Sequence, residues 1–231
     1  MIRMLSIVAV VGALPACGDD GGKAVDAAID AAAPVAFTGE MIDWDSDHGA
    51  AFCGVYMAKL TEHGNAANVD TTAPNGRIMM MLPDAPKVQV DVAPPTGASQ
   101  CSTGGMYQLP GIIITGKAVL DSGKQASYRM IGMTRLTAWY GQFGLTYDPA
   151  KAIVFVHVEG TPAAVKSSAA HDAAVAATEA TWTAGNVGQN VVFANSAVGT
   201  SDVAFEAGNG IGAQTVPTVA GTITYITLVA P

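Results

Sequence analysis

The sequence predicts a mainly β protein: two tandem small antiparallel β-sandwiches with one helix between them, after an N-terminal leader and a disordered tether. From Phe37 onward, apolar and polar residues alternate with a period of two, as in strands with one buried face. Turn-forming pairs such as Asn75-Gly76 separate the alternating runs. Charged residues make up only 13% of the chain, which has 26 glycines. This composition favours a β-rich extracytoplasmic protein over a helical bundle.

Residues 1–16 form the leader. Arg3 precedes the apolar run Met4–Leu14, and Ala16 comes directly before Cys17. The apolar run is shorter than the roughly 20 residues that span a bilayer as a helix, so the pattern predicts a cleaved secretion signal. Its end resembles the signal peptide of bacterial lipoproteins. The resemblance implies that Cys17 becomes a lipidated N-terminus that anchors the chain in a membrane. The alternative is an ordinary secretory peptide in which Cys17 is incidental.

Residues 17–36 form the tether, which is rich in Gly, Ala and Asp. The segment has little apolar surface to bury, so we expect a flexible chain with an end-to-end distance of about 25 Å. Gly18, in place of an Asp after Cys17, resembles the sorting pattern of outer-membrane lipoproteins. We therefore expect an extracytoplasmic protein of the cell envelope, lipid-anchored in the outer membrane.

The charge of the chain excludes one class of partner. The net charge is −8, and the 11 Lys and Arg residues are scattered without a basic run. Nucleic-acid binding depends on clustered Lys and Arg that neutralise phosphates. The sequence therefore predicts no nucleic-acid partner.

The first predicted sandwich covers residues 37–124. Its expected strands are Val35–Trp44, Phe52–Leu60, Arg77–Leu82, Lys87–Val92 and Leu109–Leu120. Short strands separated by turn residues at this spacing are typical of a sandwich.

Several short motifs within this segment carry a family resemblance. Gly39, Gly54-Val55, Asn75-Gly76-Arg77 and Leu82-Pro83 resemble the strand and turn motifs of the carboxypeptidase regulatory-like domain, a transthyretin-like β-sandwich. The likeness covers Phe37 to Val92, and this chain departs from the family's turn at Ala73-Pro74. The resemblance implies a supporting or partner-binding fold without catalytic residues.

Residues 125–150 are expected to form a helix and a connector. Apolar side chains recur at spacings of three to five and predict a helix over Gln125 to Phe143: Tyr128, Ile131, Leu136, Trp139, Tyr140 and Phe143. Such a stripe is typical of a face that packs against a sheet. The alternative is a ligand platform.

The second predicted sandwich covers residues 151–231. Its expected strands are Ala152–Glu159, Thr181–Thr183, Asn190–Asn195, Asp202–Glu206 and Thr222–Val229. The order of Gly turn, strand and hairpin loosely repeats that of the first segment, which favours a tandem repeat.

The cysteines indicate an oxidising compartment. With Cys17 assigned to lipid, Cys53 and Cys101 form an even pair that favours a disulfide. Closing a loop of this size stabilises the fold by roughly 4 kcal/mol in the chain-entropy model. The alternative is two free thiols.

One acidic segment is a candidate metal site. Asp43, Asp45 and Asp47 place alternate carboxylates before His48, as in loops that hold Ca²⁺. The sixth and twelfth positions of this segment lack the Gly and Glu of the EF-hand pattern. The alternative is a solvated turn that discourages edge pairing. The histidines are isolated in sequence and predict no metal site of their own.

No segment of the sequence predicts an enzyme. There is no Gly-x-Ser-x-Gly nucleophile motif. We expect a non-enzymatic envelope lipoprotein without a cofactor, whose β-sandwich domains serve a structural role or bind a protein or glycan partner. The alternative is a calcium- or carbohydrate-binding surface module. In that alternative, aromatic side chains would stack on sugar rings: Trp44, Trp139, Tyr140 or Trp182.

Overall fold

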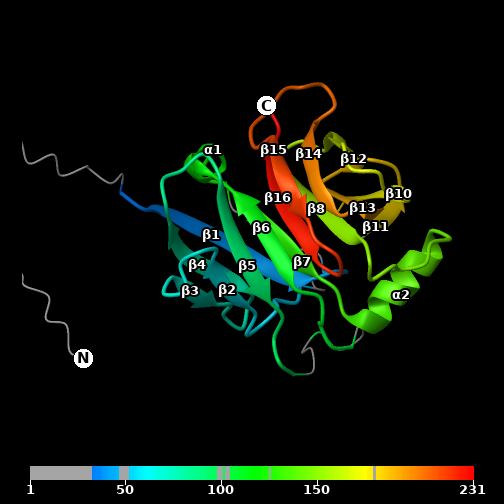
Figure 1. Cartoon of the computed structure of the whole chain (residues 1–231), viewed down its shortest axis with the longest axis horizontal. Helices are drawn as coiled ribbons and strands as arrows, with labels where there is room; N and C mark the ends of the chain where they lie inside the picture. The colour runs from blue at the N-terminus through cyan, green and yellow to red at the C-terminus, as the bar shows by residue number, and fades with distance from the viewer. Residues whose placement is uncertain (1–32, 47–51, 98–100, 102–104, 125, 179–180) are drawn as a thin grey trace, which may run out of the picture. The chain divides into compact units, whose positions relative to one another are not determined.

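The fold is mainly β. The computed structural model describes residues 33–46, 52–97, 101, 105–124, 126–178 and 181–231. Within these residues it contains sixteen strands and two helices (Figure 1). In chain order they are β1 (Val35–Asp43), β2 (Lys59–Glu62), β3 (Val69–Thr71), β4 (Arg77–Leu82), β5 (Val88–Ala93), β6 (Gly111–Thr115), α1 (Lys117–Asp121), β7 (Ala126–Met130), α2 (Met133–Gln142), β8 (Ala152–Glu159), β9 (Ala163–Ser167), β10 (Ala173–Thr178), β11 (Thr181–Ala184), β12 (Val187–Gly188), β13 (Asn190–Ser196), β14 (Gly199–Phe205), β15 (Gln214–Thr218) and β16 (Ile223–Val229).

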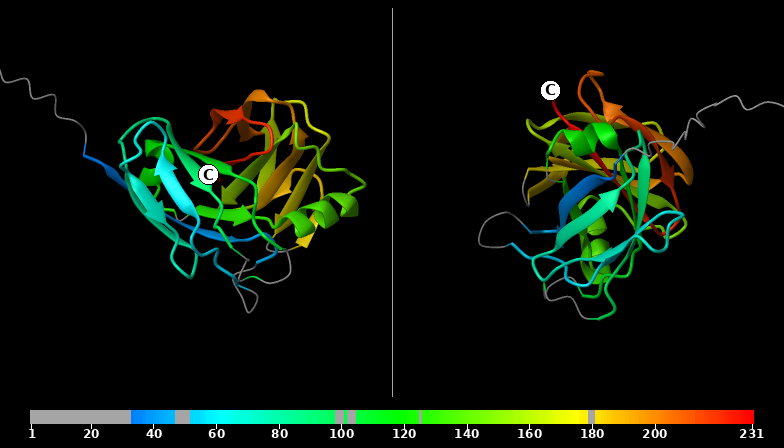
Figure 2. Two further views of the ribbon diagram at one scale, coloured as in Figure 1. Left: turned by 60° about the horizontal axis from the view of Figure 1, so that its bottom comes forward. Right: turned by 90° about the vertical axis from the view of Figure 1, so that its left-hand side faces the viewer.

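The strands form three sheets. The central sheet has nine strands in the order β11-β10-β13-β8-β16-β6-β5-β2-β3. The first outer sheet has the order β4-β1-β7, and the second outer sheet has the order β12-β9-β14-β15. Strands β1 and β4 lie at the lower left of Figure 1, and β12 and β14 lie at the upper right. The two helices lie far apart in Figure 1 and in the left-hand view of Figure 2.

The central sheet separates two hydrophobic cores. Successive side chains of a strand point to opposite faces, and in β8 Ile153 and Phe155 belong to one core while Val154 and Val156 belong to the other. The first core also contains buried residues of β1, β4, β7 and α2. The second contains buried residues of β9, β14 and β15. The first outer sheet and α2 therefore cover one face of the central sheet, and the second outer sheet covers the other.

The tandem prediction requires strands of residues 37–124 and of residues 151–231 to pair only within their own segment. The observed strand pairing crosses between the two segments. Strand β6 of the first segment pairs in parallel with β16 of the second, and β16 pairs in parallel with β8. Residues 32–231 form one compact unit. The physical reason is burial on both faces: every residue of β16 is buried, and such strands require cover on both sides.

The helix predicted over Gln125 to Phe143 is a strand followed by a shorter helix. Residues 126–130 form β7, in which all five residues are buried, and β7 pairs in parallel with β1. Gly132, with extended backbone, precedes α2. Leu136, Trp139 and Tyr140 of α2 are buried, so the predicted packing face is present in this second half.

The second expected strand, Phe52–Leu60, is also interrupted. Only β2 forms a ladder there, and Met57 adopts a positive φ of 66°. A non-glycine residue in that conformation breaks an extended strand. Strands β9, β10, β12 and β15 have no counterpart in the sequence prediction. No helix within the described ranges has the length and apolar character needed to cross a membrane.

Candidate functional site

The predicted metal site lies in a turn at the end of β1. Asp43 ends the strand, and the backbone N–H of Ser46 donates to the carbonyl of Asp43 at 3.0 Å. Arg129 of β7 is buried beside this turn, because Ile42 and Arg129 are partners in the parallel pairing of β1 and β7. Its guanidinium donates to the carbonyl of Trp44 at 2.9 Å and to that of Ser46. The buried guanidinium of Arg129 therefore stabilises the turn of residues 43–46, which we call the acidic turn.

The described carboxylates of the acidic turn have partners within the protein. Tyr107 donates its hydroxyl to Asp43 at 2.7 Å. Arg135 of α2 donates to both carboxylate oxygens of Asp45, one of them at 2.8 Å. Burial raises the pKa of Asp43, and the hydrogen bond from Tyr107 opposes that rise. A Ca²⁺ ion at this turn would have to displace Arg135 from Asp45.

The third predicted ligand, Asp47, lies outside the described residues, as does the lipidation site Cys17. Among the residues that the structure describes, no group of three His, Cys, Asp or Glu side chains converges on a common point. His63 instead contacts Asp91 at 2.8 Å, and His157 contacts Asn190 at 3.1 Å.

Cys53 and Cys101 form a disulfide, which is the pairing that the sequence favours. Their Cα atoms are 5.9 Å apart, within the usual range for this bond. The backbone N–H of Cys53 donates to the Ser46 hydroxyl at 2.6 Å. The disulfide therefore ties the segment that follows the acidic turn to residue 101.

The aromatic residues considered for sugar stacking pack against one another. Trp44 stacks on Trp182 with ring centres 4.9 Å apart, and Trp139 lies edge-on to both rings. Trp44, Trp139 and Tyr140 are fully buried, and Trp182 is partly buried. Stacking on a sugar needs an exposed ring face, so these rings act as core residues. This corrects the carbohydrate-binding role considered for them.

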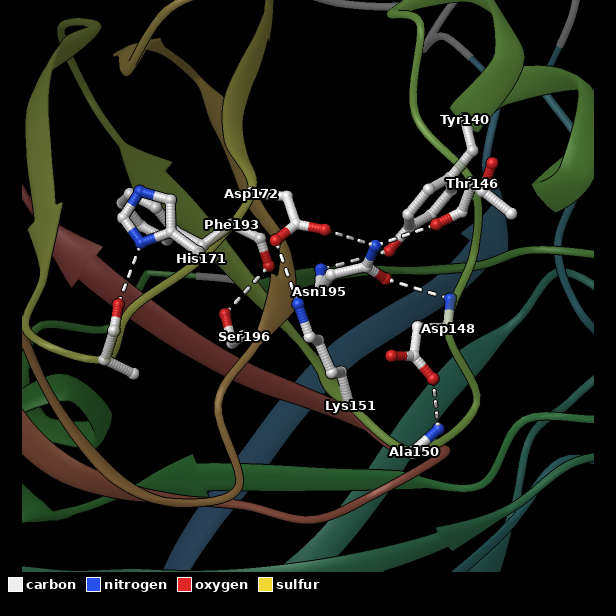
Figure 3. Close-up of polar contacts among 11 residues, drawn as sticks. Tyr140, Thr146, Asp148, Ala150, Lys151, His171, Asp172, Phe193, Asn195 and Ser196 are labelled. Atoms are coloured by element: carbon white, nitrogen blue, oxygen red, sulfur yellow. Dashed lines mark hydrogen bonds and ion pairs between the residues drawn. The ribbon is translucent and has the colours of Figure 1, made fainter.

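A second polar cluster is centred on Asn195 at the end of β13 (Figure 3). Asn195 is buried with a positive φ of 50°, at an irregularity in the pairing of β13 with β8. Its amide oxygen accepts from the backbone N–H of Asp148 at 3.1 Å. Its amide nitrogen donates to the Thr146 carbonyl and to the Asp172 carboxylate, each at 2.8 Å. One side chain thus joins β13, the residue before β10 and the segment before β8.

Asp172 also accepts from Lys151 at 2.9 Å. The hydrogen bond from Asn195, followed by that from Lys151, lowers the pKa of Asp172. The lowered pKa favours the charged form of Asp172, which pairs with Lys151. The Asn195 cluster therefore connects three segments of the chain through one buried amide and one carboxylate.

Sequence reasoning missed Arg129, Tyr107 and Asn195. Arg129 had a detectable signal, because it is a lone cation in the otherwise uncharged run Ala126–Met130, and a buried cation requires acceptors. Tyr107 and Asn195 had no detectable signal in the sequence, because their hydrogen-bond partners lie far away along the chain.

Comparison with known proteins assigns no family. No family model matches the chain, and no curated protein matches it. A solved structure, the Bacillus anthracis TIE protein, shares 8% sequence identity at a TM-score of 0.21. That comparison covers 86% of this chain and 35% of the other. A likeness at this level carries no argument about fold or function.

Proposed function

We propose that this protein is a non-enzymatic lipoprotein of the cell envelope, anchored through Cys17, with a structural or partner-binding role for its β fold. The observation that carries the proposal is the disulfide between Cys53 and Cys101. Disulfides persist in oxidising compartments and are rare in the cytosol. Together with the leader in residues 1–16, the disulfide supports export and then anchoring. Outer-membrane location is part of the proposal and rests on Gly18.

We also propose that residues 37–92 are related to the carboxypeptidase regulatory-like domain. The glycines of the resemblance have structural reasons to be glycine, which supports this relation. Gly76 has a φ of 76°, and a Cβ there would lie 2.0 Å from the Met41 carbonyl oxygen. A Cβ on Gly54 would lie 2.1 Å from the Asn75 backbone. Both positions therefore require glycine for close approach of the backbone.

The proposed partner is a protein in the envelope. Trp44, Trp139 and Tyr140 are buried in the core and Trp182 packs against it, so the rings considered for glycan binding are engaged within the protein. Calcium binding is the second candidate, because Asp45 lies close enough to Asp43 for its charge to raise the pKa of Asp43. If calcium replaces Arg135, it will raise the unfolding temperature of the wild type and leave that of Asp45→Asn unchanged.

The anchoring proposal is tested by expressing the chain in a bacterial host supplied with an alkyne-labelled fatty acid. We expect the wild type to carry the label and to sediment with membranes. The Cys17→Ser variant should carry no label and should be released from the membrane fraction. Cys101→Ser is the matched control and should be labelled like the wild type. A soluble, unlabelled wild type would contradict the proposal.

A further inference from the structure

Two strand edges meet at a seam between β3 and β4. Strand β4 is the outermost strand of the first outer sheet, and β3 is the outermost strand of the central sheet. The backbone of β4 pairs with β1 and that of β3 pairs with β2. The two edges contact each other (Figure 1), but no backbone ladder joins them in the described structure.

Side chains cross this seam in place of a ladder. The backbone N–H of Met79 donates to the Asp70 carboxylate at 2.8 Å. The carbonyl of Met81 accepts from the Asn68 amide at 2.7 Å. Glu62 holds Asn68 in place by accepting from the same amide nitrogen at 2.7 Å. The two hydrogen bonds to the β4 backbone are exposed. Their side chains can rotate away and leave the β4 edge open to another strand.

Exposed apolar side chains lie along the same seam. Met79 is 60% exposed and Met81 is 51% exposed, while the alternate residues Ile78 and Met80 point into the core. Val69 on β3 is 46% exposed. Two apolar side chains on the β4 edge, with a third on the neighbouring β3 edge, are a favourable surface for the alternate side chains of an added strand.

A groove continues the seam at the Met81 end. Its volume is about 390 Å³. Its lining residues come from the first described residues of the chain, the segment that joins β2 to β3, and the end of β4: Pro34, Glu62, Asn65, Asn68, Met81, Leu82 and Pro83. An extended segment that lies along β4 therefore has room to continue beyond the end of the strand.

We propose that the β4 edge binds an extended peptide segment of a partner protein by strand addition. The partner backbone pairs with Met79 and Met81 and displaces the side chains of Asp70 and Asn68. Its alternate apolar side chains contact Met79, Met81 and Val69, and a basic residue lies near Glu62 and Asp70. This inference rests on the partner-binding role proposed above and gives it a surface and a class of ligand.

The charges at the seam favour such a peptide over other occupants. A second copy of this chain in a two-fold symmetric contact would bring Glu62 and Asp70 against the same carboxylates, and like charges at an interface are unfavourable. The same carboxylates would oppose an anionic lipid surface. A peptide with alternating apolar residues and terminal lysines meets both the apolar and the acidic parts of the seam.

The test measures binding of a synthetic peptide, Lys-Val-Thr-Val-Thr-Val-Lys, to the full chain carrying Cys17→Ser. Calorimetry gives the affinity, and hydrogen exchange locates the contact. We expect slower exchange of the Met79 amide on binding. The double variant Met79→Thr, Met81→Thr keeps β-forming residues and should bind at least about tenfold more weakly, a change equivalent to about 1.4 kcal/mol. Val187→Thr, at an equally exposed valine on β12, is the matched control and should bind normally.

A further variant separates strand addition from nonspecific apolar contact. Asn68→Ala removes the side chain that covers the Met81 carbonyl without changing charge, so it should strengthen peptide binding. The inference is overturned by an absence of binding to the wild type, by equal effects of the methionine and Val187 variants, or by self-association that protects β4 without peptide. Because the protein lacks Cys17, failure of the lipid anchor does not affect these results.

Discussion

The acidic turn and the Asn195 cluster both use a carboxylate, yet the two sites shift its pKa in opposite directions. In the acidic turn, burial raises the pKa of Asp43. In the Asn195 cluster, hydrogen bonds from Asn195 and Lys151 lower the pKa of Asp172. The side chains of Lys151 and Asp172 are 37% and 40% exposed, whereas Arg129 beside the acidic turn is buried. Loss of the Arg129 charge should therefore lower the free energy of unfolding far more than loss of the Lys151 charge.

The largest expected effect is at Arg129. The Arg129→Met variant leaves the carbonyls of Trp44 and Ser46 buried without this donor and removes a cation near Asp43. Loss of a buried charged partner costs about 3–5 kcal/mol. Lys151→Met, the matched change at the exposed pair, should cost no more than about 1 kcal/mol. Urea unfolding of the two variants measures both values, and equal losses would contradict the comparison.

The disulfide beside the acidic turn should have the next largest effect. Replacing Cys53 and Cys101 together by Ser should lower the free energy of unfolding by about 2–4 kcal/mol. Reduction of the wild type with dithiothreitol should give the same loss. If reduction leaves the unfolding midpoint unchanged, the disulfide does not stabilise this part of the fold.

Two variants at Asn195 separate its hydrogen bonds from its backbone conformation. Asn195→Ala removes the amide contacts and places a less tolerant residue at positive φ, so we expect a loss of about 1–3 kcal/mol. Asn195→Gly also removes the contacts but accepts this φ without strain. Thermal unfolding should therefore show the glycine variant to be the more stable of the two. The reverse order would show that the positive φ carries no cost.

The smallest effect is a change in pH dependence. The lowered pKa of Asp172 contributes stability that is present above the unfolded value near 3.8 and is lost as the pH falls through the folded pKa. Asp172→Asn should lose less stability on acidification than the wild type.

The raised pKa of Asp43 acts in the opposite sense, because its carboxylate takes up a proton at a higher pH in the folded state than in the unfolded state. Asp43→Asn should therefore lose more stability on acidification, as followed by thermal unfolding across this range.

The sequence predicted strands best where apolar residues are large and continuous. β4 and β8 have the bounds that their apolar patterns predict, Arg77–Leu82 and Ala152–Glu159. The Asn75-Gly76 turn is also present, with Gly76 at positive φ. β9 and β10 were missed because their residues are mostly alanine and other small side chains, which give little periodic signal.

Pairing between distant strands could not be predicted. The parallel contact of β6 with β16 joins residues more than a hundred positions apart, and local periodicity carries no information about such partners. The same limit applies to the acidic turn. Alternating Asp43 and Asp45 indicated a cation, but Arg135 lies on a helix far along the chain and is the cation that Asp45 contacts. The shared central sheet is a consequence of these long-range pairings.

We propose that the chain is an envelope lipoprotein anchored at Cys17, and the intact mass of the mature protein is the decisive measurement. The protein is extracted from membranes with detergent and measured before and after hydrolysis of its ester-linked acyl chains. We expect an N-terminus at Cys17 carrying a diacylglyceryl group and an amide-linked acyl chain. A mature N-terminus elsewhere, or an unmodified Cys17, would contradict it.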